Sequence, residues 1–375
     1  MTSRPCPPPA TKVLRQGAGA LFCLALGLAT LRIAPVQAAE TPPASASPPR
    51  ERPLHRYEFE RAEMGVPFRV TLYAWNPALA KVSAAAALDR VRELNAILSD
   101  YEPDSELTRL SQTAGSGDWT PVSDPLWEIL VYAQDLATRT DGAFDVTVGP
   151  AVNLWRRARR LRELPPTEAL NTARRAVGHG HLALDAGTHR ACLRVPGMKL
   201  DLGGVAKGYA LDAAMQVLKA RGIRHALVSG GGDLLVSEPP PGEPGWRIEL
   251  APLDAPDAPP ARFLRLKHVA LATSGDLFQH VEIDGVRYSH IVDPRTCLGL
   301  TDHSLVTVIA PCGMIADSLS TSLSVLGPAR GMEWIRTQPG IEAHIARRPA
   351  DVIETCESAG FKAWLEAEPP PLPTP

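Results

Sequence analysis

Residues 281–288 (V-E-I-D-G-V-R-Y) constrain the fold most, because they predict a β-hairpin. Two short runs flank Asp284-Gly285, and an Asp-Gly pair suits the type I′ turn that joins antiparallel strands. Alternating and helical periodicities predict further elements, namely strands at 68–74, 224–229 and 304–310 and helices at 83–98, 125–138 and 205–221. Strands in hairpins, with helices between groups of them, favour an α+β fold with largely antiparallel sheets and packed helices over a doubly wound parallel sheet.

Two shorter segments carry local signals. Phe144, Val146 and Val148 alternate with polar residues, which predicts a strand closed by Gly149-Pro150. Residues 101–110 (Y-E-P-D-S-E-L-T-R-L) combine turn and helix-capping residues. They predict a turn that opens a short helix.

Composition limits the classes of function. The 375 residues are 45% hydrophobic and 21% charged, as in a soluble globular protein of one large domain or two smaller ones. The formal net charge of −2 gives no indication of nucleic-acid binding. Aromatic residues make up only 5%, which argues against a stacking surface for single strands. We therefore expect no nucleic acid among the partners.

The first 38 residues have the features of a signal peptide. Lys12 and Arg15 precede an apolar run at 18–31 that is too short for a comfortable membrane span, and Val36-Gln37-Ala38 forms a small-residue cleavage site. We expect cleavage after Ala38 and export to the periplasm; the alternative is an uncleaved membrane anchor. The expected organisation is a signal peptide at 1–38, a proline-rich tether at 39–56, one continuous domain at 57–366 and a proline-rich tail at 367–375.

Export would determine which cysteines remain in the mature protein and whether they can form disulfides. Cys6 and Cys23 would leave with the signal peptide, and the remaining four are Cys192, Cys297, Cys312 and Cys356. In an oxidising compartment these could form two disulfides with any of three connectivities. No C-x-x-C pair or His/Cys spacing indicates zinc or haem.

The segment A-D-S-L-S-T-S-L (316–323) reads as a helix that carries a candidate metal site. Asp317 and Thr321 are four residues apart and therefore share one face. A carboxylate and a hydroxyl side by side form a hard-oxygen site of the kind Mg²⁺ prefers. His290 lies upstream, ahead of an Asp-Pro-Arg turn, and histidine is the usual general base at neutral pH. This combination suggests chemistry on a phosphate; the alternative is a capped helix and a structural histidine.

The segment D-L-G-G-V-A-K-G-Y (201–209) is a second candidate site. Its two glycines at a helix start would let backbone N–H groups approach an anion, and Lys207 lies one turn further on. It is neither a Walker A loop nor a G-x-G-x-x-G dinucleotide fingerprint. The alternative is a glycine-permitted turn with a solvated lysine.

Taken together, eight stretches in this order resemble one family, the FAD:protein FMN transferases (ApbE family). They are M-G-V-P-F (64–68), L-S-D-Y-E-P-D-S-E-L-T-R-L (98–110), G-A-F-D-V-T-V-G-P-A-V-N-L-W (142–155), D-L-G-G-V-A-K-G-Y-A-L-D (201–212), S-G-G-G-D (229–233), A-T-S-G-D (272–276), Y-S-H-I-V-D-P-R-T (288–296) and A-D-S-L-S-T (316–321). Each stretch is weak alone, but the ordered set covers about residues 57–365 and is specific.

The resemblance implies an ApbE-like (T-fold-like) single body with a defined set of site residues. It implies an exported, Mg²⁺-dependent enzyme that splits FAD, moves FMN onto a threonine or serine hydroxyl of a partner and releases AMP. By similarity, the flavin nucleotide site would be lined by Met64, Tyr101, Ala143, Phe144, Asp145, Asp201, Lys207 and Ile291. The metal ligands would be the Gly204 carbonyl, Asp317 and Thr321, with His290 as the base.

The resemblance also implies a partner. It would be a target flavoprotein with a D-x-x-[ST]-G-A-T-like acceptor segment, exported or membrane-bound, and a loose association with the inner membrane is consistent with such a target. Two other functions stay open, an FAD pyrophosphatase that uses water as the acceptor and a flavin-binding protein without turnover.

Three positions depart from the family's usual pattern. Val66 replaces a common threonine near the flavin site, and Ser229 precedes the glycines where asparagine or alanine is more usual. Cys297 stands where relatives usually have glycine. It would be strained if that position requires a positive φ angle, or could pair with Cys312.

Overall fold

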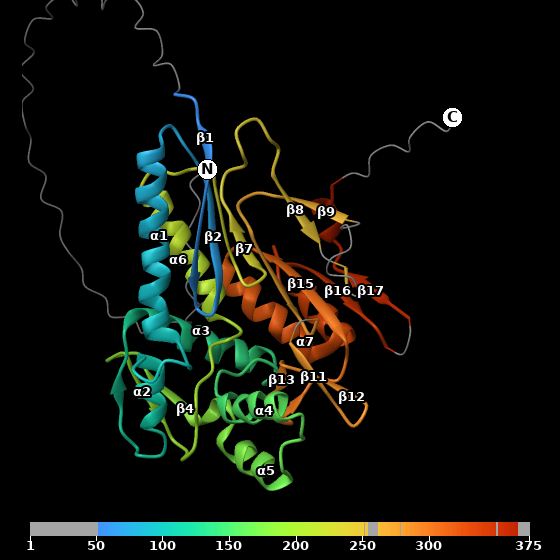
Figure 1. Ribbon diagram of the computed structural model, residues 1–375. Coiled ribbons are helices and arrows are strands. Elements are labelled where there is room, and N and C mark those ends of the chain that lie inside the picture. Colours follow the sequence, from blue (N-terminus) through green and yellow to red (C-terminus); the bar gives the residue numbers. More distant parts are fainter. Residues whose placement is uncertain (1–51, 251, 254–261, 278, 350–351, 367–375) are drawn as a thin grey trace, which may run out of the picture.

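The structure is a computed structural model that describes residues 52–250, 252–253, 262–277, 279–349 and 352–366 (Figure 1). The predicted signal peptide and tail, and most of the predicted tether, lie outside the described residues. Among the helices of the described part, none combines the length and apolar character needed to cross a bilayer.

An eight-stranded sheet forms the centre of the fold, with the strand order β1-β2-β6-β7-β10-β15-β16-β17. Every pairing within it is antiparallel. Its strands are β1 (His55–Glu63), β2 (Val66–Ala74), β6 (Ala226–Gly230), β7 (Asp233–Val236), β10 (Ala270–Gly275), β15 (Ser304–Ala310), β16 (Glu342–Arg347) and β17 (Glu354–Glu357). The expected α+β class with largely antiparallel sheets is therefore confirmed.

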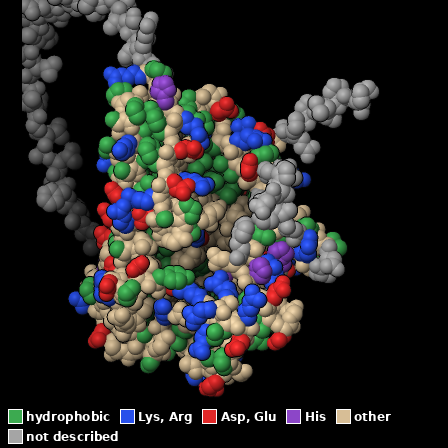
Figure 2. Space-filling view, in the orientation of Figure 1, with side chains coloured by type: hydrophobic (Ala, Val, Ile, Leu, Met, Phe, Trp, Pro, Cys, Tyr) green, Lys and Arg blue, Asp and Glu red, His purple; other side chains and the backbone are tan. Residues whose placement is uncertain are grey.

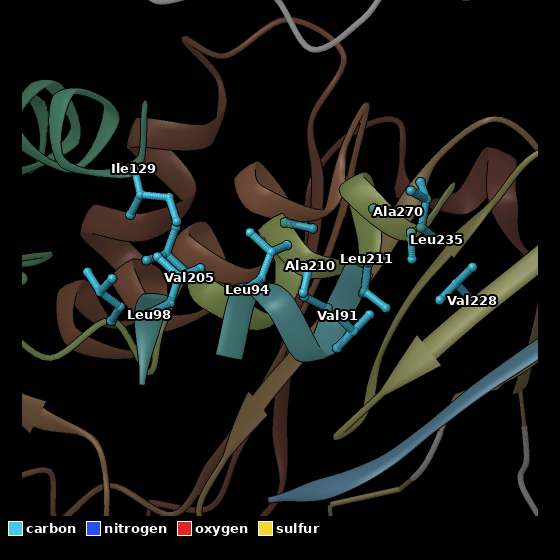
Figure 3. Packing of buried hydrophobic residues seen from close by; sticks show 14 of the residues in the cluster. Val91, Leu94, Leu98, Ile129, Val205, Ala210, Leu211, Val228, Leu235 and Ala270 are labelled. Carbon is cyan, nitrogen blue, oxygen red and sulfur yellow. The ribbon is translucent and has the colours of Figure 1, made fainter. Parts of the chain in front are cut away.

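Three long helices pack against this sheet and against one another (Figure 1). They are α1 (Pro77–Leu98), α6 (Ala206–Ala220) and α7 (Gly313–Ile335). The apolar positions of α1 recur at helical spacing, so that one stripe of the helix is buried. In Figure 3, Val91 and Leu94 of this stripe meet Ala210 and Leu211 of α6, with strand residues such as Val228 beyond them. This packing fixes the N-terminal ends of α6 and α7 beside the sheet.

In the described part of the chain, the remaining elements are six helical segments and four small sheets. The helices are α2 (Glu106–Gln112), α3 (Asp124–Arg139), α4 (Gly149–Leu161), α5 (Thr167–Ala176) and the short turns η1 (His179–His181) and η2 (Phe361–Trp364). The small sheets consist of β3 (Thr120–Pro121), β4 (Leu182–Asp185) and β5 (Arg190–Leu193); β8 (Trp246–Leu250) and β9 (Arg262–Leu266); β11 (His280–Ile283) and β12 (Val286–Ser289); and β13 (Val292–Asp293) and β14 (Leu298–Gly299).

The hairpin predicted at 281–288 is present as β11 and β12. Asp284 and Gly285 have φ angles of 51° and 76°, as a type I′ turn requires. The turn at 101–105 also opens a short helix, α2, whose Ser105 side chain accepts a hydrogen bond from the Thr108 N–H at 3.0 Å. These features have strong local signals.

The strand predicted at 144–148 is wrong. The segment is a series of turns, and Val148 forms only an isolated bridge with Lys199. The Asp145 carboxylate accepts hydrogen bonds from both the backbone and the hydroxyl of Thr147, and such local bonds compete with strand pairing. Pro150 lies in the first turn of α4, where proline is tolerated, so Gly149-Pro150 begins a helix and does not close a strand.

Cys297, which stands where relatives usually have glycine, has the positive φ angle that would make a cysteine strained at this position. Its φ angle is 58°, a left-handed conformation that costs a non-glycine residue about 1–2 kcal/mol. Its side chain is fully buried against Trp155, whose indole N–H donates to the Cys297 carbonyl at 2.9 Å. The suggested pairing with Cys312 does not form, and no disulfide joins the four described cysteines.

Candidate functional site

A cavity of about 970 Å³ opens between the sheet, the N-terminal ends of α6 and α7, and helix α4. This volume suits a cofactor-sized ligand. Figure 2 shows the hollow near the centre of the molecule. All twelve residues that the resemblance implies for the site line this cavity: Met64, Tyr101, Ala143, Phe144, Asp145, Asp201, Gly204, Lys207, His290, Ile291, Asp317 and Thr321. Residues more than 200 positions apart in sequence therefore share one pocket.

The three residues implied to supply oxygen ligands for a metal all line this cavity. Asp317 and Thr321 lie one turn apart on α7, as their spacing predicted. The Gly204 backbone packs directly against Thr321, because a Cβ on Gly204 would lie only 2.9 Å from the Thr321 hydroxyl. The Ser274 hydroxyl is 3.4 Å from the same oxygen. A side chain at position 204 would therefore displace Thr321.

These residues fit a small, hard cation. The described part of the chain contains no group of three or more His, Cys, Asp or Glu side chains that could hold a metal, so an ion here would rely on hydroxyl, carbonyl and substrate oxygens as well. Carboxylate, hydroxyl and carbonyl oxygens are the ligand types that Mg²⁺ accepts, usually together with substrate phosphates. Asp233 adds a second buried carboxylate, whose Oδ2 faces the Lys207 ammonium group.

Lys207 lies between two buried carboxylates. Its Nζ is 3.5 Å from Asp233 Oδ2 and 3.6 Å from Asp317 Oδ1. Burial alone would lower the pKa of Lys207, but the two carboxylates outweigh this effect and raise it. Burial, reinforced by Asp317, raises the pKa of Asp233 to about 7 despite the ammonium group. The cluster holds one cation for two carboxyl groups, so it retains an affinity for further positive charge.

Three of the contacts between α6 and α7 hold α7 in place. The first is a glycine crossing, in which a Cβ on Gly208 would lie 2.1 Å from the Gly313 carbonyl oxygen. The second is a cap supplied by α6. The Asp212 carboxylate accepts hydrogen bonds from the backbone N–H groups of Gly313 at 2.7 Å and Met314 at 2.9 Å. The Gly208 N–H also donates to Asp317 Oδ2 at 2.9 Å, which orients that side chain.

His290 follows β12 and faces the same cavity. Its Nδ1 lies 3.1 Å from the carbonyl oxygen of Gln279. A carbonyl can only accept, so Nδ1 carries the proton and Nε2 keeps its lone pair. Burial lowers the pKa of His290 to about 4, and the positive charges of Arg159 and Lys207 act in the same direction. The imidazole is therefore neutral at physiological pH and can accept a proton.

The residues implied for the flavin nucleotide range from the exposed entrance of the cavity to buried positions. Met64 and Gly65 form the two-residue turn between β1 and β2, with φ angles of 50° and 75°. Tyr101 is 73% exposed at the entrance. Asp145 is buried, and burial raises its pKa. Ile291 is buried directly after His290.

Arg156 was not among the predicted residues, yet it connects three parts of the mouth. Its guanidinium donates to Asp100 and, at 2.9 Å, to Asp201, and it lies 4.2 Å from the centre of the Tyr101 ring. Burial and the neighbouring Asp100 raise the pKa of Asp201, an effect that Arg156 opposes. The signal that could have identified it is the run R-R-A-R-R-L-R at 156–162, five arginines in seven residues.

Comparisons with known proteins agree with this geometry. The model of the ApbE family matches residues 64–345. The FAD:protein FMN transferase of Escherichia coli K12 is 34% identical over 280 residues, which cover 72% of this chain and 78% of that protein. The corresponding protein of Vibrio cholerae is 33% identical over 320 residues, covering 84% and 94%.

Solved structures agree as well. The apo form of the flavinyl transferase ApbE of Pseudomonas stutzeri superposes with a TM-score of 0.74 at 31% identity, covering 84% of this chain and 98% of that one. The flavin transferase ApbE of Vibrio cholerae gives the same TM-score at 29% identity, covering 83% and 100%. The match covers most of this chain, and the chain belongs to the ApbE family.

Proposed function

We propose that this protein is an FAD:protein FMN transferase that moves FMN from FAD to a threonine or serine hydroxyl of a target flavoprotein and releases AMP. Its relatives are flavin transferases. One observation carries the proposal for this chain: an oxygen-rich cation site and a neutral histidine face the same cofactor-sized cavity. That arrangement suits phosphoryl transfer, which depends on positioning and charge neutralisation.

The proposed reaction breaks the phosphoanhydride bond of FAD and forms a phosphoester bond to the acceptor hydroxyl. The acceptor hydroxyl oxygen forms a bond to the phosphorus of the FMN half of FAD. The bond from that phosphorus to the bridging oxygen breaks, and the electron pair leaves with AMP. The hydroxyl proton moves to Nε2 of His290, which carries a lone pair because Nδ1 donates to Gln279.

Asp317, Thr321 and the Gly204 carbonyl would hold Mg²⁺. When bound, Mg²⁺ supplies charge neutralisation at the pyrophosphate and stabilises the departing phosphate. Lys207 adds a fixed positive charge beside the same site. Tyr101 and Met64, at the mouth, would hold the flavin nucleotide where an acceptor protein can reach it.

The site of action is also a proposal. The signal-like features of residues 1–38 support export to the periplasm, with an exported or membrane-bound flavoprotein as the target and loose membrane association as a consistent arrangement. We keep the organisation into a tether at 39–56, a transferase domain at 57–366 and a tail at 367–375 as part of this proposal.

Intact mass spectrometry tests the reaction. The chain from residue 39 onward is mixed with FAD, Mg²⁺ and a domain that carries a D-x-x-[ST]-G-A-T-like segment. We expect the acceptor to gain the mass of one FMN, and we expect Asp317→Ala and His290→Ala to abolish the gain. Free FMN and AMP beside an unmodified acceptor would instead indicate an FAD pyrophosphatase. Intact FAD would indicate a flavin-binding protein without turnover.

A further inference from the structure

The mouth of the cavity is bordered on one side by helix α4, which is rich in arginine and exposed on its outer side. Helix α4 packs its apolar face, centred on Trp155 and Ala158, against α5 and the β13 region. The opposite side carries Arg157 and Arg160, which are exposed, and the chain continues into exposed Arg162. Arg159 is half-buried and lines the cavity. We call Arg157, Arg159, Arg160 and Arg162 the α4 arginine face.

The charge on this face is not compensated within the fold. Among the described residues, none of the ion pairs involves the four arginines of the face. Residues 149–176 contain seven arginines and two glutamates, whereas the whole chain has a net charge of −2. The rest of the chain is therefore net negative. In Figure 2, Lys and Arg side chains gather next to the hollow, in the region of α4.

Fold stability accounts for only part of this arrangement. The negative end of the helix dipole favours cations in the last turn, which includes Arg159 and Arg160, but Arg157 lies before that turn. Like charges three and four residues apart, such as Arg157 and Arg160 or Arg156 and Arg160, destabilise a helix. Helix α4 also carries no acidic residue that would relieve this repulsion. A face that weakens its own helix indicates a role in binding.

The α4 arginine face reaches the part of the cavity that contains His290. The Arg159 guanidinium donates to the Gln279 side chain at 3.2 Å, and the Gln279 backbone carbonyl holds His290. A protein segment that brings its hydroxyl to Nε2 of His290 therefore passes close to Arg159. Residues on one side of that hydroxyl would then lie over the rest of the arginine face.

We propose that the α4 arginine face docks an acidic stretch of the target flavoprotein next to its acceptor hydroxyl. This inference rests on the proposed function and adds the chemistry by which the acceptor is recognised. Charge complementarity at a rim acts mainly on the rate of encounter, so its effect belongs in kcat/KM for the acceptor and not in kcat. The net negative remainder of the molecule would repel an acidic partner, which favours this one approach.

The test reverses two charges that do not line the cavity. In Arg157→Glu/Arg160→Glu we expect kcat/KM for an acidic acceptor domain to fall about 10-fold or more at about 0.01 M salt, with a much smaller loss at about 0.15 M, where screening shortens the Debye length to about 8 Å. The affinity for FAD and the kcat at saturating acceptor should not change. The control, Arg221→Glu/Arg336→Glu, makes the same charge change beyond the C-terminal ends of α6 and α7, and should leave kcat/KM within about 2-fold.

Exchanging the charges of the acceptor as well shows whether the double variant has lost docking or has lost its folded structure. Replacing the acidic residues beside the acceptor hydroxyl with lysine should impair transfer by the wild-type chain and restore it with Arg157→Glu/Arg160→Glu. The proposal is overturned if the double variant keeps the wild-type kcat/KM, or if the control loses as much. It is also overturned if the variant loses only its binding to phosphatidylglycerol vesicles, since the face would then contact a membrane. If the wild-type chain transfers no FMN at all, the proposed function itself has failed.

Discussion

His290 shows how one residue can be prepared for proton transfer by its surroundings. The Gln279 carbonyl holds Nδ1, and burial disfavours the charged ring, so that Nε2 stays free and basic. A base with a pKa of about 4 is weaker than an ordinary histidine, but it is fully deprotonated at neutral pH. Such a base suits a reaction in which the histidine does not have to pass its proton to the leaving group. A departing phosphate bound to a cation needs little protonation.

The first prediction concerns this ring. In a ¹H–¹⁵N NMR titration, the His290 imidazole should remain neutral from pH 7 down to about pH 5 and take up its proton near 4. The assignment comes from comparison with His290→Gln, which should also lower kcat by about 10²–10⁴-fold without changing FAD affinity. Titration near the ordinary value of 6.5 would contradict the burial of the ring and its assignment as a neutral base.

A second prediction concerns Arg156, which joins Asp100, Asp201 and Tyr101. Arg156→Ala leaves two neighbouring carboxylates without their shared cation. We expect the free energy of unfolding to fall by about 2–4 kcal/mol. This is at the low end of the range for breaking a buried ion pair, because the arginine side chain is 23% exposed. FAD affinity should fall as well, since Tyr101 and Asp201 lose their support.

Urea unfolding and FAD titration measure these two effects. Arg156→Lys is the matched variant. It keeps the charge but lacks the planar fork that binds two carboxylates together, so it should recover less than half of the loss. An unchanged free energy of unfolding in Arg156→Ala would show that the three contacts do not cooperate.

At the scale of elements, the site depends on how closely α6 and α7 approach. Gly208 and Gly313 allow the two backbones to touch, and Asp212 caps the first turn of α7 from across the interface. Asp317 and Thr321 follow on the same helix within two turns. Their positions relative to Gly204 are therefore determined by a helix crossing and not by a flexible loop.

The third prediction tests this crossing. In Gly208→Ala the added Cβ would lie 2.1 Å from a backbone oxygen, so the helices must separate. We expect the free energy of unfolding to fall by about 3 kcal/mol or more. This is at the upper end of the range for overpacked sites, because a backbone group cannot rotate away from the added methyl group. Gly180→Ala is the control, since its Cβ meets nothing within 4 Å and needs no unusual φ angle. Chemical denaturation compares the two; equal stability would mean that the helices adjust without cost.

The elements that sequence reasoning found have local signals. The Asp284-Gly285 turn and the Asp317–Thr321 spacing are properties of neighbouring residues, and both appear in the structure. The strand prediction at 144–148 was wrong because alternating apolar and polar residues are also compatible with turns. Here the turns are stabilised by hydrogen bonds from Thr147 to Asp145. Arg156 was missed for the opposite reason, since its three partners come together only in the folded chain.

At the scale of the whole molecule, the order of the eight strands could not be derived from sequence. β7 pairs with β10 across the excursion that includes β8 and β9, and β10 pairs with β15 across both small hairpins. Strand β1 was not predicted at all, although it pairs with β2 over nine residues, because its alternation is carried largely by charged residues such as Glu58 and Glu60. The resemblance to a family supplied the global arrangement that local patterns lack.

The last prediction joins charge to the stability of the whole fold. Asp233 and Asp317 share one lysine, and their mutual repulsion helps to raise the pKa of Asp233. Asp317→Asn keeps the shape and an acceptor for the Gly208 N–H but removes one charge. Without Mg²⁺, this variant should therefore be at least as stable as the wild-type chain.

Mg²⁺ should reverse that order. An ion that binds only the folded state stabilises it by about 2.7 kcal/mol at a concentration 100 times its Kd. The wild-type chain should therefore gain several degrees in Tm when Mg²⁺ and FAD are added together, whereas Asp317→Asn should gain only what FAD alone provides. Differential scanning calorimetry with and without Mg²⁺ measures both effects. A variant that is less stable without the ion, or that responds to it like the wild-type chain, would remove Asp317 from the cation site, and the site must then be sought around Asp233.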